Sequence, residues 1–408
     1  MRPALLRDLL GMVLGGTGLI VASSAMAGGG EPTVRESAMV AAPAPPAFDE
    51  AAALRTYLGS VEAIAAAGGF QPVPGEATLR AGVRSAAVAM LDRRLRQSGE
   101  LAVRRRDSLL FDAPLADAVA RFQQSHGLDA DGVVGKRTFA LLNEPATTLA
   151  QRIRVNLVRL ASGPSVATGR HIVVNLPGFT LTAYTDGRAV LTMPVIVGRK
   201  ERPTPVLSGS ITHLVLNPEW NVPATILRKD VARGMLDDPA AYLATHDLQW
   251  EAFGTRQSIA TAAIDWQSVA AGHSRLRLVQ PPGPNNPLGR VKFQFDNAFD
   301  VYLHDTNERA RFAKTDRALS SGCVRVADPL ALARYVAQGS QLPWERWYQD
   351  PTWHTRWMKV PTPVTVTLAY RTIWADPSGQ VQVRADLYGH DAREAEALAA
   401  TVVAALAE

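Results

Sequence analysis

The chain has 408 residues, of which 47% are hydrophobic and 20% are charged, a composition that is ordinary for a soluble globular protein of two or three domains. A net charge of +5 and an isoelectric point near 9.5 favour an acidic partner, a class that includes wall polymer, lipid surface and nucleic acid. Cys323 is the only cysteine, which excludes a disulfide bond within the chain.

Residues 1–27 have the pattern of an export signal. Arg2 and Arg7 precede the uncharged apolar run 9–21, and Ala25-Met26-Ala27 supplies a cleavage site. The run is shorter than the roughly 20 residues that cross a bilayer, and an uncleaved segment associated with the inner membrane is the alternative. We therefore expect a protein of the periplasm or cell envelope, in which residues 28–49, rich in Gly, Ala and Pro, form a flexible linker.

Residues 50–168 are predicted to be helical, with a compact unit of three helices at about 79–143. Two stretches of this unit, AVARFQQSHGL at 118–128 and DGVVGKRT at 131–138, resemble the peptidoglycan-binding type 1 module. The resemblance implies a wall-binding domain. A helical spacer that binds nothing is the alternative, because a fold does not guarantee a retained activity.

The helical unit also contains a basic cluster. A nucleic-acid partner is not expected, because no aromatic residues alternate with these charges and export removes that partner. We instead expect a solvated face that favours anionic wall or membrane. The cluster consists of Arg93, Arg94, Arg96, Arg104, Arg105 and Arg106.

Residues 169–390 show strand patterns, beginning with 171–176, 180–184, 190–197 and 209–216. Residues 225–270 interrupt them with short helices expected at 229–235, 239–245 and 266–271, which predicts an insertion over the sheet and a candidate lid. After the strands resume, we expect a helical patch that contains Trp344, Trp347, Trp353 and Trp357. A strand pair at 364–370 and 381–387 follows, and residues 391–408 form a terminal helix or tail.

The stretch 301–326 carries the candidate catalytic residues. A thiol needs a base to become a useful nucleophile, and His304 ends a strand pattern upstream of Cys323. The small residues Ser321 and Gly322 suit a tight turn, in which the N–H groups of Gly322 and Cys323 would face an oxyanion. Composition alone leaves a buried, inert cysteine as the alternative.

The same stretch resembles the active-site motif of the L,D-transpeptidase (YkuD-type) family, in which a His and a spacer precede Ser/Thr-His-Gly-Cys and an Asn or Arg. Here 15 residues, 305–319, form the spacer, and Ser321 replaces the second His of most members. YLHDT at 302–306 and SSGCVR at 320–325 are similar to the larger periplasmic branch. The resemblance implies an α+β multidomain chain: a β-rich YkuD-type catalytic domain with a helical cap, plus the three-helix wall-binding domain.

The resemblance also implies acyl transfer through a thioester. Cys323 would attack the carbonyl between diaminopimelate and the terminal D-Ala of a peptidoglycan stem peptide, while His304 takes the thiol proton. A second stem peptide would then accept the acyl group and give a 3→3 cross-link. Carbapenems are implied as stable acylating agents. An L,D-carboxypeptidase, a lipoprotein-to-wall transferase and a non-catalytic wall-binding protein are the alternatives.

Further residues are predicted around this pair. Arg325 would bind a substrate carboxylate or, equally, form a salt bridge within the fold. Tyr302 shares a strand face with His304 and is a pocket wall or core residue, whereas Asp305 points to the other face and is structural. Trp220, in a Pro-flanked turn, and Ser320 complete the predicted substrate-binding set. The remaining histidines lack ligand spacing, so neither a metal nor a cofactor is expected.

Overall fold

The computed structural model describes residues 48–407 except 76, 104, 165, 232–233, 236–237 and 272–274. The predicted export signal and nearly all of the predicted linker lie outside the described residues. Within the part of the chain that is described, no helix has both the length and the apolar character needed to cross a membrane.

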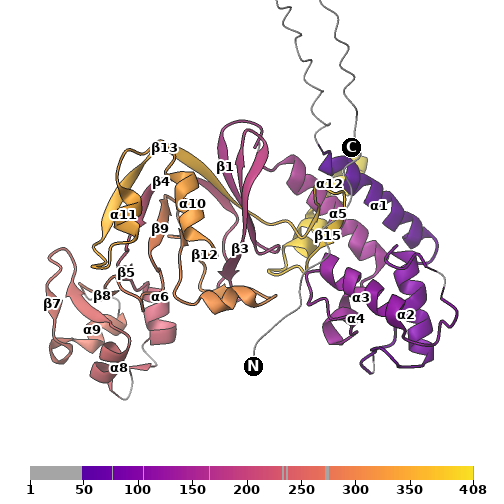
Figure 1. The fold of residues 1–408 in the computed structure, drawn as a ribbon, viewed down its shortest axis with the longest axis horizontal. Helices are drawn as coiled ribbons and strands as arrows, with labels where there is room; N and C mark the ends of the chain where they lie inside the picture. Colours follow the sequence, from indigo (N-terminus) through magenta and orange to yellow (C-terminus); the bar gives the residue numbers. More distant parts are fainter. Residues whose placement is uncertain are drawn as a thin grey trace, which may run out of the picture. The chain divides into compact units, whose positions relative to one another are not determined.

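Five helices make up the described N-terminal region (Figure 1). They contribute to two separate cores. One core lies among α2, α3 and α4 and includes the buried side chains of Leu91, Leu115 and Phe122. The other core joins α1 and α5 to a hairpin from the C-terminal part of the chain. The helices are α1 (Glu50–Ala66), α2 (Ala86–Gln97), α3 (Ala113–Ser125), α4 (Lys136–Leu142) and α5 (Ala146–Ala161).

Only part of the basic cluster is the solvated face that its sequence predicts: Arg93 and Arg106 are exposed, whereas Arg94 and Arg105 are enclosed. The Arg105 side chain is 1% exposed and bonds to Asp92 at 2.7 Å and Asp112 at 2.8 Å. Arg94 is buried, donates to the Leu142 carbonyl at 2.7 Å and stacks 3.6 Å from the centre of the Phe70 ring. These arginines therefore stabilise the helical unit, because a buried guanidinium requires a partner.

Nine strands of the described chain form one sheet, in the order β11-β3-β12-β10-β9-β4-β13-β1-β2. Strand β2 also pairs with β3, so the sheet closes on itself around a core of mostly branched aliphatic and aromatic side chains. The strands are β1 (Arg170–Asn175), β2 (Thr180–Thr185), β3 (Arg188–Gly198), β4 (Leu207–Leu216), β9 (Val291–Phe295), β10 (Leu303–His304), β11 (Ala318–Ser320), β12 (Val324–Val326) and β13 (Arg356–Ala369).

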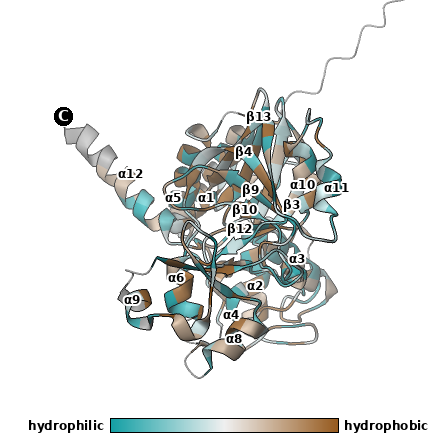
Figure 2. Cartoon of the chain, turned by 90° about the vertical axis from the view of Figure 1, so that its left-hand side faces the viewer, coloured by the Kyte–Doolittle hydropathy of each residue, from teal (hydrophilic) through white to brown (hydrophobic). Residues whose placement is uncertain are grey.

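The insertion is a small α+β unit with its own sheet, in the order β5-β8-β6-β7, and its own apolar core around Trp250. Figure 2 shows hydrophobic residues on α6 and α9 of this unit. The helices predicted at 239–245 and 266–271 are confirmed. In the segment predicted as a helix at 229–235, the structure describes a π-helix over Leu227–Val231. Its elements are β5 (Trp220–Asn221), α6 (Ala224–Ile226), the π-helix (Leu227–Val231), α8 (Pro239–Thr245), β6 (Gln249–Ala252), β7 (Ser258–Ile259), a 3-10 helix (Thr261–Ala263), α9 (Trp266–Ala271) and β8 (Leu276–Gln280).

Two predictions for the C-terminal part are wrong. β13 is a central strand that pairs with β4 and β1, and residues 381–383 pair instead with 373–375 in the hairpin that packs on α1 and α5. Of the four tryptophans, Trp353 lies in a turn and Trp357 on β13. The remaining elements are a 3-10 helix (Arg309–Ala313), α10 (Pro329–Val336), α11 (Trp344–Tyr348), β14 (Ile373–Ala375), β15 (Val381–Val383) and α12 (His390–Ala407).

Candidate active site

The register of three neighbouring strands gathers the candidate site on one face of the sheet. His304 on β10 lies opposite Arg325 on β12 and opposite Lys292 on β9. Residues that are opposite each other point to the same face, and residues two apart on a strand do so as well. The intervening positions, Leu303, Val324 and Phe293, are fully buried in the core on the other face. The site face therefore presents Lys292, Tyr302, His304, Cys323 and Arg325.

Cys323 occupies the end of the turn that leads into β12. The residue is half-buried, and its Sγ lies 4.0 Å from the carbonyl oxygen of Asp300. Burial raises the pKa of the Cys323 thiol, although hydrogen bonds from Tyr302 and the positive charge of Lys292 act in the opposite direction. The resting thiol is therefore protonated at neutral pH.

His304 is 4% exposed, and its ring is oriented by a backbone carbonyl. Nδ1 lies 2.5 Å from the carbonyl oxygen of Asp305. A carbonyl only accepts hydrogen bonds, so Nδ1 carries the proton toward Asp305, and the Pro287 carbonyl is a second backbone partner of the ring. In this tautomer Nε2 is the nitrogen that can act as a base. Burial, and then the charge of Arg325, lower the pKa of His304 to about 3, so the imidazole is neutral at physiological pH.

Tyr302 and Lys292 surround this pair. The Tyr302 ring meets the His304 ring edge to face, with 5.6 Å between the ring centres. The Lys292 ammonium lies 4.0 Å from the centre of the Tyr302 ring, a cation–π contact. Burial lowers the pKa of Lys292 and raises that of Tyr302. Our sequence reasoning missed Lys292, although its place between Val291 and Phe293 in an alternating strand is the signal that puts it on the polar face.

The Asp305 carboxylate supports the loop before β9 instead of orienting His304. It accepts hydrogen bonds from the backbone N–H of Arg290 at 2.8 Å and of Thr306 at 2.6 Å, and it pairs with Arg309. Gly289 has a φ of +57°, and a Cβ at this position would overlap the Asp305 side chain. Asp305 is thus enclosed on the opposite side of the strand from the site, which is the structural role that strand alternation predicts.

Arg325 forms a salt bridge within the fold, and one of its N–H donors, on Nε, has no described partner. Its Nη1 bonds to Glu308 at 2.5 Å, and its side chain is 15% exposed. Its Nε is buried and has no hydrogen-bond partner among the described residues. Of the two roles predicted for Arg325, the structure shows the salt bridge within the fold, and this salt bridge does not exclude a carboxylate ligand.

The turn before Cys323 differs from its prediction in two respects. Ser320 is 3% exposed, and its Oγ donates to the Cys323 carbonyl at 2.6 Å, so this side chain is enclosed and does not line a substrate pocket. The same Oγ accepts the N–H of Gly322 at 3.1 Å, which removes that N–H as an oxyanion donor. Ser321 accepts a hydrogen bond from Arg202 at 2.9 Å. Of the two N–H groups predicted to face an oxyanion, that of Gly322 is thus used within the turn, and that of Cys323 stays the candidate.

Trp220 packs against the core of the insertion, on a strand that pairs with β8, so the structure places it in that unit's sheet. In the described ranges no group of three or more His, Cys, Asp or Glu side chains is arranged to hold a metal ion.

Comparisons with known proteins give family matches for two parts of the chain. Residues 169–366 match the model of the YkuD family, described as "L,D-transpeptidase catalytic domain", and residues 84–142 match that of a "Putative peptidoglycan binding domain". A curated Haemophilus influenzae protein named "Putative L,D-transpeptidase" is 31% identical over 250 residues. That match covers 60% of this chain and 49% of the relative, so the chain spans about half the length of this relative.

The solved structures of L,D-transpeptidases that the chain resembles have lower sequence identity. An L,D-transpeptidase from Stackebrandtia nassauensis is 13% identical with a TM-score of 0.26, over 74% of this chain and 98% of that one. An L,D-transpeptidase from Xylanimonas cellulosilytica is 16% identical with a TM-score of 0.23, over 72% and 98%. On the family models, the chain carries a YkuD-type L,D-transpeptidase catalytic domain at residues 169–366, preceded by a peptidoglycan-binding type 1 module at 84–142.

Proposed function

We propose that this protein is a peptidoglycan L,D-transpeptidase that forms 3→3 cross-links through a thioester on Cys323. The observation that carries the proposal is the shared face of His304, on β10, and Cys323, in the turn that leads into the adjacent strand β12, inside the matched catalytic domain. An intact nucleophile and base favour an enzyme over a non-catalytic wall-binding protein. Mass spectrometry of muropeptides incubated with the purified protein tests the proposal.

The first half-reaction would begin from two neutral groups. As the Cys323 sulfur attacks the carbonyl carbon between diaminopimelate and D-Ala, its proton passes to Nε2 of His304. The tetrahedral intermediate then collapses, the C–N bond breaks, and the imidazolium returns the proton to the amine of the departing D-Ala. The raised thiol pKa and the lowered imidazole pKa favour proton transfer during attack over a preformed ion pair.

The second half-reaction would release the enzyme. The side-chain amine of another stem peptide attacks the thioester and gives a proton to His304, the C–S bond breaks, and Cys323 recovers its proton. Water as the acceptor would make the protein an L,D-carboxypeptidase, and a protein amine would make it a lipoprotein transferase. Cross-linked, trimmed and protein-linked products distinguish these three outcomes by mass.

Negative charge on the carbonyl oxygen would be stabilised from two directions. The N–H of Cys323 is one donor, and the hydroxyl of Tyr302, which bonds to the thiol in the resting state, is the other. Lys292 adds a positive charge beside both groups. The planar guanidinium of Arg325 would bind a carboxylate of the stem peptide, for which its shape is suited.

The wall-binding module and the proposed substrate together favour a location in the periplasm or cell envelope. Peptidoglycan is then both the substrate of the catalytic domain and the ligand of the module. The export signal predicted at residues 1–27 would deliver the chain to that compartment.

Deleting residues 79–143 is expected to weaken binding to intact sacculi more than it slows turnover of soluble muropeptides, because the module has its own core and the catalytic face lies on the sheet. Pull-down with sacculi measures the first effect and muropeptide kinetics the second. Thermal unfolding of the deleted chain controls for damage, since Arg384 donates to the Ser125 carbonyl of the module at 2.8 Å. Equal pull-down of both chains would reduce the module to a spacer.

A further inference from the structure

The turn that carries the nucleophile rests on the loop 198–204, which follows β3. The N–H of Arg199 donates to the Ser320 carbonyl at 3.0 Å, and Thr204 Oγ1 donates to the Gly322 carbonyl at 2.7 Å. Arg202 adds its bond to the Ser321 hydroxyl. Each of the three residues before Cys323 is therefore bonded to this loop.

The bond from Thr204 controls the group that we assign to the oxyanion. The carbonyl of Gly322 and the N–H of Cys323 belong to one planar trans peptide unit, so they point in opposite directions. Gly322 has a φ of +124°, a region open to glycine, in which little else opposes rotation of the following peptide. By binding the carbonyl on one side, Thr204 aims the N–H of Cys323 to the other side.

Thr204 is itself fixed by the loop and by Tyr388. Its side chain is buried, and its Oγ1 accepts the N–H of Gly198 at 2.8 Å. The Tyr388 hydroxyl donates to the Gly198 carbonyl at 2.6 Å and accepts the N–H of Thr204 at 3.3 Å. A Cβ on Gly198 would lie 2.6 Å from the Thr204 nitrogen, so the two ends of the loop approach too closely for any other residue. Tyr388 thus closes the loop.

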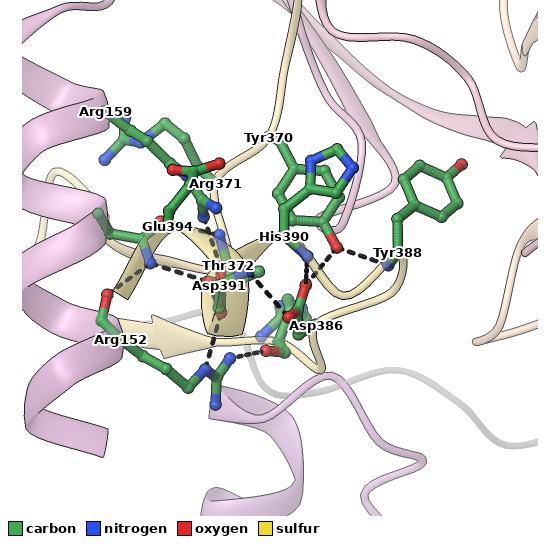
Figure 3. Close-up of polar contacts among 12 residues, drawn as sticks. Arg152, Arg159, Tyr370, Arg371, Thr372, Asp386, Tyr388, His390, Asp391 and Glu394 are labelled. Atoms are coloured by element: carbon green, nitrogen blue, oxygen red, sulfur yellow. Dashed lines mark hydrogen bonds and ion pairs between the residues drawn. The ribbon is translucent and has the colours of Figure 1, made fainter. Parts of the chain in front are cut away.

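Tyr388 comes from the C-terminal segment, which lies beyond the matched catalytic domain. Its N–H donates to the Tyr370 hydroxyl at 2.7 Å, and that hydroxyl donates to Asp386 at 2.7 Å (Figure 3). Asp386 accepts the N–H of Asp391 at 2.9 Å. The Asp391 carboxylate in turn pairs with Arg152 on α5 at 2.8 Å, as Figure 3 also shows. A continuous set of polar contacts therefore leads from α5 to the nucleophile turn.

We propose that Thr204 and Tyr388 are positioning residues that hold the Gly322–Cys323 peptide with its N–H toward the oxyanion. On this view residues 370–391 are part of the working catalytic unit, although the family match ends at residue 366. The proposal rests on the proposed acyl transfer through Cys323. It concerns the orientation of a donor and not the reactivity of the thiol, which distinguishes it from a role in general stability.

The test compares Thr204→Val, Thr204→Ser and Tyr388→Phe in the full chain. Valine keeps the shape of threonine and removes its hydroxyl, serine restores the hydroxyl, and phenylalanine keeps the contact with the Tyr370 ring, whose centre is 5.6 Å away. Thr192→Val on the exposed part of β3 and Tyr242→Phe in the insertion are the matched controls. Each variant is measured for kcat and KM of cross-linking, for the alkylation rate of Cys323 by iodoacetamide, and for thermal unfolding.

We expect Thr204→Val to lower kcat about tenfold, which is less than the loss of a whole oxyanion donor because the N–H is misdirected and not removed. Its KM and alkylation rate should stay within about twofold, since neither depends on that N–H. Tyr388→Phe should lower kcat by about threefold, because a mispositioned loop has a partial effect. Thr204→Ser and both controls should retain wild-type kcat.

Three results would overturn the inference. The first is an unchanged kcat in Thr204→Val. The second is a fall in the alkylation rate of Cys323 as large as the fall in kcat, and the third is a folded Thr204→Ser variant whose kcat stays as low as that of Thr204→Val. A wild-type protein that forms no acyl transfer product would instead overturn the proposed function on which the inference depends. Wild-type turnover therefore separates the two cases.

Discussion

Replacing Cys323 with alanine is expected to lower cross-link formation to the background of a control without protein, a loss of at least about 10³-fold. The acyl group of the donor stem peptide has no covalent carrier when the sulfur is absent. The substitution is structurally mild, because the residue is half-buried and its main-chain bonds to Ser320 do not involve the thiol. Mass spectrometry of muropeptides, with disaccharide tetrapeptide as the substrate, gives the measurement.

Cys323→Ser is the matched variant for this experiment. It keeps the shape and polarity of the turn but places a far less acidic hydroxyl beside the same base, so it should fail as the alanine variant does. Near-wild-type thermal unfolding of both variants shows that the fold survives. Cross-linking by the alanine variant above background would mean that another group carries the acyl chain.

His304→Gln is expected to reduce the acylation rate by about 10² to 10⁴-fold, the usual contribution of a general base. The glutamine amide can still donate to the Asp305 carbonyl, so it preserves a polar contact while removing the basic nitrogen. His304→Ala should show a similar loss. His354→Ala is the control, because the His354 side chain is 70% exposed. Circular dichroism must show that both His304 variants are folded, so that a lower rate reports the loss of the base.

The pH profile of the same step tests the environment of the base. Because the pKa of His304 is lowered to about 3, Nε2 stays unprotonated as pH falls from 8 to 5, and the acylation rate should remain level over that range. Loss should set in only as pH approaches 3, where protonation removes the lone pair. Measuring acylation alone keeps the acceptor amine out of the profile. A midpoint near 6.5, the value of an exposed imidazole, would show that the ring is not buried during the reaction.

Much of the site could be predicted from the sequence because its residues lie on short strands with regular alternation. Val301–Leu303 reads as a strand that ends at His304, and this pattern correctly places Tyr302 and His304 on one face. The small residues of the Ser320–Gly322 turn were also identified. Local periodicity was enough for these predictions, because neighbouring residues on the same strand determine which face each side chain occupies.

Where the predictions differ from the structure, the partner of a polar side chain is the cause. The sequence predicts that Ser320 binds substrate, whereas the turn folds back and uses its hydroxyl for Gly322 and Cys323. The sequence predicts a solvated face for Arg105, because its acidic partners, Asp92 and Asp112, lie in other segments of the unit. The sequence pattern alone does not show which group forms the hydrogen bond or ion pair of a polar side chain.

The pairing of the C-terminal strands fails for a related reason. The turn at Asp376-Pro377-Ser378-Gly379 is a real hairpin, but it joins β14 to β15. The sequence pattern predicts residues 364–370, now part of β13, as the first strand of this hairpin. β13 instead pairs along β4 and β1, which lie far earlier in the chain. Strands that follow each other in the sequence usually pair, but β13 pairs with strands that are distant in the sequence.

Intact-protein mass spectrometry with a carbapenem tests the central claim, that Cys323 is the nucleophile, most directly. The wild-type protein should gain the mass of one opened carbapenem, and peptide mapping should place that mass on Cys323. Cys323→Ser should show no adduct, and His304→Ala should form it far more slowly. An unmodified wild-type protein, or an adduct mapped to another residue, would contradict the assignment of Cys323 and the acyl-transfer function built on it.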